Sequence, residues 1–127
     1  MEYLLDMHIF LWYVEGSSKL SPRVLKIIQD KSNGKLVSIA SLWEIAIKIN
    51  KGNLNLSMPF PVLDRYIELN QFKILPVSFE HLIQIEKIPR FHADPFDHLL
   101  IAQAMIENLT IVSADRHFTA YPINVIA

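Results

Sequence analysis

The chain has no cysteine among its 127 residues. Disulfide bonds and thiolate metal sites are therefore excluded, and we expect an ordinary intracellular, cytoplasmic setting. Glycine is scarce, with three residues, and neither the P-loop nor the glycine-rich dinucleotide-binding motif is present. The GxSxG nucleophile elbow of the serine hydrolases is also missing. These absences remove thiol chemistry and the common nucleotide-binding loops from the candidate functions.

A basic excess is missing as well. The chain has 12 Lys+Arg against 13 Asp+Glu, a net charge of −1. This overall charge does not favour a nucleic-acid partner, but a bound cation would offset several acids locally. No apolar run approaches the length of about 20 residues that a bilayer crossing needs. Since Glu2 and Asp6 interrupt the first residues, we expect neither a signal peptide nor a membrane segment.

Hydrophobic residues, in contrast, make up 51% of the chain, enough for a buried core in a single domain over residues 1–127. Strands are predicted at 3–6, 36–40, 74–77, 110–113 and 123–126. Helices are predicted at 7–15, 22–31, 42–51, 79–86 and 95–107, with one more inside 59–70. Ser21, Ser41, Ser78 and Asp94 are the expected N-caps. Strands alternating with helices predict an α/β fold, with a mostly parallel sheet covered by helices on both faces.

Acidic residues recur where an apolar segment meets a helix start. They are Asp6, Glu44, Asp94, Asp97 and Asp115. In open α/β sheets ligands bind outside the carboxyl ends of the strands, so acids at these junctions are expected to share one crevice. Carboxylates that meet there repel one another unless a divalent cation lies between them. This pattern predicts metal-assisted chemistry on a phosphate.

Two of these acids have a simpler interpretation. Asp6 is placed to cap the helix that follows it, by accepting a hydrogen bond from a free backbone N–H. Glu44 is placed to form an i,i+4 pair with Lys48, worth about 0.3–0.5 kcal/mol. Trp43 and Ile47 flank Glu44, however, so a carboxylate in a partly apolar groove is an equal alternative.

The acids near residue 95 have different predicted roles. With Pro95 at the first helical position, Asp94 is the natural N-cap. Asp97 begins a helix that is apolar on nearly every side, so it is the better candidate for a metal ligand. Asp115 follows a strand and is either a metal ligand or a helix cap. The hydroxyl of Ser113 is placed to hold a metal-bound water or to cap the same turn.

The basic residues and histidines carry weaker signals. Lys48 and Lys51 are candidates for contacts with a phosphate backbone, or are simply solvated. No histidine pair has a metal-ligand spacing such as H-x-x-x-H, and surface or partly buried structural roles are expected for each of them. They are His8, His81, His92, His98 and His117.

Four segments, in their order and spacing, resemble the PIN-domain family, and more specifically the VapC-type ribonuclease toxins of bacterial toxin–antitoxin pairs. The similarity runs from the first predicted strand to the last. The segments are Leu4-Leu5-Asp6, Ser41 to Lys48, Asp94-Pro95-Phe96-Asp97 running on to Ala104, and Ile111 to Asp115.

The resemblance implies an α/β/α sandwich and a Mg²⁺- or Mn²⁺-dependent endoribonuclease that hydrolyses RNA with a metal-activated water. Asp6, Glu44, Asp97 and Asp115 match the acidic quartet of the family, and Asp94 matches a more peripheral acid. The implied partners are an RNA substrate, a cognate antitoxin that occupies the active-site groove, and a second copy of the chain in a homodimer.

Two residues depart from the family pattern. His98 stands where related sequences often have arginine, and Asn53 where they commonly have lysine. Both departures are expected to remove positive charge near the RNA path. Two alternative functions remain, a non-catalytic PIN-like module for RNA binding or assembly and a Mg²⁺-binding phosphoacceptor domain. The second usually has paired acids near the first strand and a lysine late in the sheet, whereas here Asp6 is single and no lysine follows Lys87.

Overall fold

A single parallel sheet forms the centre of the molecule in the computed structural model, which describes residues 1–127. Its order is β3-β2-β1-β4-β5, and every pair of neighbours is parallel, so the predicted fold class is confirmed. The chain first adds strands on one side of β1 and then on the other, which makes the region beside β1 and β4 a topological switch point. The strands are β1 (Glu2–Leu5), β2 (Gly34–Ser38), β3 (Lys73–Leu75), β4 (Thr110–Val112) and β5 (Val125–Ile126).

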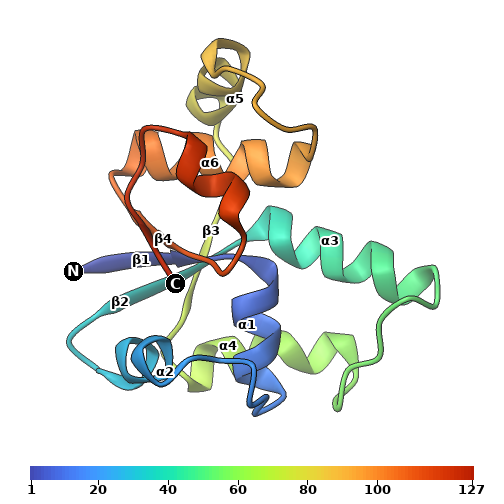
Figure 1. Cartoon of the computed structure of the whole chain (residues 1–127). Coiled ribbons are helices and arrows are strands. Elements are labelled where there is room, and N and C mark those ends of the chain that lie inside the picture. The colour runs from blue at the N-terminus through green and yellow to red at the C-terminus, as the bar shows by residue number, and fades with distance from the viewer.

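Helices cover both faces of this sheet (Figure 1). Two short 3-10 helices, η1 (Phe60–Val62) and η2 (Arg116–Ala120), accompany them. None of the helices combines the length and the apolar character that a bilayer crossing requires. The α-helices are α1 (Met7–Val14), α2 (Pro22–Gln29), α3 (Ile39–Asn50), α4 (Leu63–Leu69), α5 (Phe79–Lys87) and α6 (Pro95–Glu107).

Alternate residues of the strands point into two separate cores. Leu5 of β1 packs with α1, α2, α3 and α4 on one face, whereas Leu4 packs with α6 and η2 on the other. Both leucines are 0% exposed, as are Ile111 and Val112 of β4. A strand buried on both faces is the typical element of a parallel sheet between two helical layers. The central strands therefore hold their carboxyl ends rigidly.

Three of the four predicted helix caps are confirmed. The hydroxyl of Ser21 accepts from the N–H of Val24, and that of Ser78 accepts from the N–H of His81. Asp94 accepts from the N–H groups of Phe96 and Asp97. Each cap depends only on residues within one turn, and so the sequence predicts it well.

The predicted cap at Ser41 is wrong. Ser38 caps α3 by accepting from the N–H of Ala40, and Ser41 lies buried one turn further on. The strand was expected to reach Ala40, but β1 pairs with β2 only as far as Leu5 opposite Val37. β3 pairs with β2 one residue further, as far as Leu75 opposite Ser38. Beyond Ser38 neither neighbouring strand continues the ladder, and the chain turns into the helix three residues early.

The observed bounds of three other elements differ from the predicted ones. The helix expected inside 59–70 divides into η1 and α4. The strand expected at 74–77 spans Lys73–Leu75, because Pro76 has no N–H to continue the ladder. The last strand was expected at 123–126 and contains only Val125–Ile126.

Candidate active site

A small pocket opens at the carboxyl ends of β1 and β4. Its volume is about 50 Å³, far below the 300–1,000 Å³ typical of organic ligands, and so it suits an ion and its waters. Five of its lining side chains are acidic and come from four different parts of the chain. The lining consists of Asp6, Met7, His8, Glu44, Asp94, Asp97, Leu100 and Asp115.

The sheet topology brings these acids together. Asp6 directly follows β1, and Ser113 and Asp115 follow β4, which is hydrogen-bonded to β1. The N–H of Asp6 donates to the carbonyl of Val112 at 3.0 Å, so the two strand ends stay in register up to the pocket. The acids predicted to converge therefore line one pocket at the switch point, where ligands bind in open α/β sheets.

Asp6 has both of the roles that the sequence left open. Its Oδ1 accepts from the N–H of Ile9 at 2.8 Å and caps α1, while its Oδ2 accepts from the hydroxyl of Ser113. The Ser113 oxygen accepts in turn from the N–H of Asp115 at 2.9 Å. Burial raises the pKa of Asp6, and the hydrogen bonds from Ser113 and Ile9 oppose that rise. The Asp6 side chain therefore caps α1 and lines the pocket at the same time.

Glu44 enters the pocket from α3. Burial is the main cause that raises the pKa of Glu44. The charge of Asp94 adds to the rise, and the charge of Lys48 opposes it. The i,i+4 salt bridge with Lys48 does not form, since the ion pairs of the structure all use histidine. Lys48 is half-buried and Lys51 is exposed at the end of α3. The partly apolar groove predicted for Glu44 is therefore the better description.

Asp97 lies in the first turn of α6 and lines the pocket. Burial raises its pKa to about 6, a hydrogen bond from His92 opposes the rise, and the charges of Asp94 and Asp115 add to it. Asp94 is exposed and holds the cap of α6, so it lies at the rim. Asp115 is also at the rim, where it accepts from the N–H of His117 and caps η2.

His92 belongs to this site, and its role was not predicted. Its Nε2 lies 3.0 Å from Oδ2 of Asp97, and its Nδ1 lies 2.8 Å from the hydroxyl of Tyr121. The Tyr121 oxygen also accepts from the N–H of Phe91, and the ring of His117 stacks on the His92 ring at 4.7 Å. All these groups are satisfied when Tyr121 donates to Nδ1 and Nε2–H donates to Asp97. Sequence spacing carries no signal for this network, because it joins residues 29 positions apart.

His98 lies inside the protein rather than on its surface. The side chain is 6% exposed, and its Nε2 donates to the carbonyl of His92 at 2.7 Å. It therefore faces inward and holds the loop that carries His92, and the loss of positive charge near an RNA path stays a prediction. Asn53 is exposed just beyond α3, where its N–H donates to the carbonyl of Lys48.

The donor set fits a hard divalent cation. No three side chains of the histidine or acidic type already form a complete metal-ligating group. Carboxylate oxygens are nonetheless the ligands that Mg²⁺ prefers, and Mg²⁺ usually binds through one or two of them while keeping several waters. Three pocket acids, Asp6, Glu44 and Asp97, have raised pKa values. A bound cation would favour their charged forms and relieve their repulsion.

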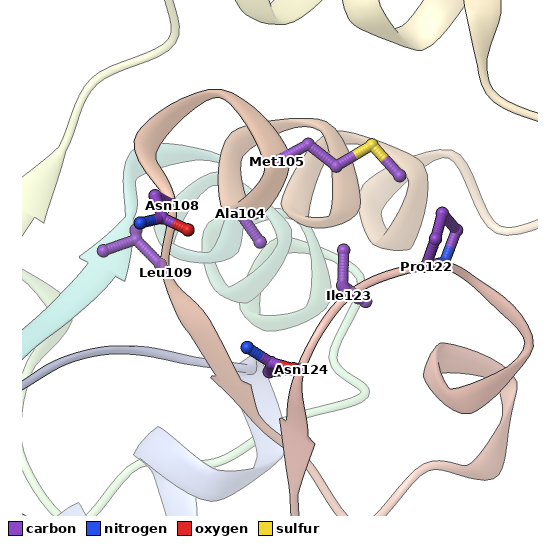
Figure 2. A pocket seen from close by; sticks show the side chains of 7 residues that line it. All are labelled: Ala104, Met105, Asn108, Leu109, Pro122, Ile123 and Asn124. Carbon is purple, nitrogen blue, oxygen red and sulfur yellow. The ribbon is translucent and has the colours of Figure 1, made fainter.

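A larger hollow of about 330 Å³ lies at the opposite edge of the sheet (Figure 2). It is formed where α6 ends and where β4 and β5 begin, and it has no ionisable side chain. This hollow therefore offers no group for acid–base or metal chemistry. The lining residues are Ala104, Met105, Asn108, Leu109, Pro122, Ile123 and Asn124.

The fold and the site together define a class of protein. It is an α/β/α protein with an acidic pocket at the switch point of its parallel sheet. The model of the PIN domain matches residues 3–124. The chain belongs to the PIN-domain family, and the predicted family is confirmed. A search with the sequence among curated proteins found no significant match.

Solved structures share this fold at low sequence identity. The chain is similar to VapBC2 from Rickettsia felis bound to a promoter DNA fragment, with a TM-score of 0.74, 16% identity, and coverage of 99% of this chain and 98% of the other. FitAcB from Neisseria gonorrhoeae gives a TM-score of 0.67, 20% identity, and coverage of 98% and 96%. A toxin–antitoxin complex from Klebsiella pneumoniae gives a TM-score of 0.66, 13% identity, and coverage of 98% and 96%. The fold is therefore shared with these structures over nearly the whole chain.

Proposed function

We propose that the protein is a Mg²⁺- or Mn²⁺-dependent endoribonuclease and the toxin of a toxin–antitoxin pair. The observation that carries this proposal is the meeting of Asp6, Glu44, Asp97 and Asp115 in one small pocket at the switch point of a PIN fold. Such a pocket is too small for an organic ligand and too acidic to bind a phosphate without a cation.

Each acid has a distinct part in the proposed mechanism. Asp6 offers an oxygen held in place by the Ser113 hydroxyl and the Ile9 N–H, and Asp97 offers one oriented by His92. Asp115 completes the site from the rim. Glu44, whose pKa is raised, is suited to accept the proton of the attacking water. Asp6, Asp97 and Asp115 would hold a divalent cation, which would supply a more acidic water and would offset the negative charge that develops on the leaving oxygen.

The proposed protein partners are a cognate antitoxin and a second copy of the chain. The Klebsiella pneumoniae toxin–antitoxin complex has the same fold, which supports the antitoxin. The exposed face of α5 supports self-association, since Phe79 is 76%, Leu82 48% and Ile83 43% exposed. Light scattering of the purified protein tests the homodimer, and co-purification with the product of the neighbouring reading frame tests the antitoxin.

Isosteric variants of two pocket acids test the nuclease. Asp6→Asn and Asp97→Asn are expected to lower Mg²⁺-dependent cleavage of single-stranded RNA by about a hundredfold or more, because each removes a charged ligand. Asp64→Asn changes an exposed acid of α4, outside the pocket, and serves as the matched control. Circular dichroism checks that all three variants fold. Full cleavage by either pocket variant would contradict the assignment.

The two alternative functions have separate tests. A non-catalytic module would bind RNA without cleaving it in Mg²⁺ or Mn²⁺, and the purified protein distinguishes this directly. A phosphoacceptor domain would be labelled by acetyl phosphate. The pocket lining contains no lysine, and the match to the PIN model also argues against this second alternative.

A further inference from the structure

Two aromatic side chains lie beside the acidic pocket without a place in either core. Trp43 precedes Glu44 on α3 and is 61% exposed. Its indole packs edge-to-face on the half-buried ring of Phe96, with the ring centroids 5.3 Å apart and the planes at 67°. Phe96 lies in the first turn of α6, between the pocket acids Asp94 and Asp97.

Folding alone does not explain this pair. Neither ring belongs to the two hydrophobic core clusters or to the side chains packed against them. A tryptophan contributes most to stability when it is buried, and an indole left mostly in water is characteristic of a binding surface. Contact with Phe96 directs the indole toward the turn of α6 that carries Asp94 and Asp97.

We propose that Trp43 and Phe96 form a platform on which a base of single-stranded RNA stacks, next to the phosphate held at the acidic pocket. This inference rests on the proposed nuclease function. Trp43 adjoins Glu44 on α3 and Phe96 adjoins Asp97 on α6, so the same two helices carry the platform and the pocket acids. The proposal places the phosphate at the pocket and the base of the same nucleotide on the rings.

The charge of the protein favours stacking as a source of affinity. Single-strand binders usually combine a basic groove with aromatic rings. This chain has a net charge of −1, and the pocket lining contains no lysine or arginine. Lys48 lies one helical turn beyond Glu44 and is half-buried, and His8 lines the pocket itself. Few cationic side chains are available here to bind the phosphates of RNA. We therefore expect the aromatic rings to contribute a larger share of the affinity for RNA.

The presence of just two tryptophans makes the platform directly observable. In Trp12→Phe protein, Trp43 is the sole indole. We expect a single-stranded adenylate hexamer, added with Ca²⁺ in place of Mg²⁺, to quench its fluorescence in a saturable manner. An abasic ribose-phosphate hexamer has the same charge but no bases, and we expect it to leave the signal unchanged.

Substitutions give the strength of the contact. Trp43→Ala is expected to weaken binding of the adenylate hexamer by about tenfold or more, and Trp43→Tyr, which keeps a ring, to recover most of that loss. Cleavage by Trp43→Ala should show a raised KM with kcat nearly unchanged. Leu69→Ala removes an apolar side chain that is 66% exposed on α4, outside the pocket and away from the α5 face, and is the control.

Different outcomes separate this inference from the nuclease proposal. If wild type cleaves RNA while Trp43→Ala binds the hexamer as tightly as wild type, the platform is refuted and the nuclease stands. If Trp43 responds to the hexamer but no RNA is cleaved in Mg²⁺ or Mn²⁺, the platform stands and the nuclease fails. Conversion of a dimer to a monomer by Trp43→Ala, without a change in hexamer affinity, would assign the pair to a contact between two copies and overturn the proposal.

Discussion

Replacing Asp97 by asparagine is predicted to stabilise the protein in the absence of metal. Burial raises the pKa of Asp97 from 3.8 to about 6, which means that the folded state binds its proton more tightly than the unfolded chain. Between pH 3.8 and about 6 the folded protein holds a proton that the unfolded chain has lost. The free energy of unfolding therefore falls as the pH rises through this window, and the penalty is complete above it.

The size of the effect follows from this pKa. The rise in the pKa of Asp97 from 3.8 to about 6 corresponds to a penalty of about 3 kcal/mol on the free energy of unfolding. The side chain is 17% exposed, and solvent screening reduces the penalty to about 1–2 kcal/mol. The charged carboxylate also interacts favourably with the N-terminus of α6, which opposes the penalty by about 0.3–1 kcal/mol. Asp97→Asn should thus raise the free energy of unfolding by about 1 kcal/mol at pH 8.

Urea unfolding in a chelating buffer measures this difference at pH 8 and at pH 4. The gain should disappear at pH 4, where Asp97 is protonated in the folded wild type. Added Mg²⁺ should stabilise wild type and have little effect on the variant, since a cation favours the charged carboxylate. Asp64→Asn, on the exposed side of α4, should show neither effect. An Asp97→Asn gain that is absent at pH 8, or equal at both pH values, would refute the burial penalty.

Two further predictions concern the groups that hold the pocket acids. Ser113→Ala leaves Oδ2 of the buried Asp6 without its donor, so the free energy of unfolding should fall by about 1–3 kcal/mol and RNA cleavage should weaken; unchanged cleavage and stability would contradict the role of this hydrogen bond. His92→Ala removes the group that orients Asp97, so Mn²⁺ affinity, measured by calorimetry, and RNA cleavage should each fall by about 10–100-fold. Tyr121→Phe, which removes only the partner of His92, should cause a smaller loss in both assays.

Much of the fold could be predicted because its signals are local. The caps at Ser21, Ser78 and Asp94 each involve a hydrogen bond across two or three residues. Strand ends were predicted less well. The position at which β2 stops depends on where its neighbours β1 and β3 stop, and no pattern inside β2 contains that information.

The candidate site also combines residues that the sequence predicts with residues that only the fold brings together. Its five acids could be picked out because each one stands at a junction between an apolar segment and a helix, and such junctions meet at one edge of a parallel sheet. His92 could not be picked out, since its place depends on Tyr121 and Asp97 together. His98 could not be placed either, because its burial depends on how the loop before α6 folds back.

The sequence by itself thus determined which residues begin helices, which segments are apolar enough for the sheet, and which acids stand at their ends. Hydrogen bonding and side-chain periodicity within one or two turns decide these features. The tertiary structure alone decided that Asp6 caps a helix while it lines the pocket, that His92 orients Asp97, and that Trp43 meets Phe96 beside the acids. Burial and hydrogen-bond geometry depend on neighbours that are distant in the chain, and those neighbours exist only once the sheet has set their positions.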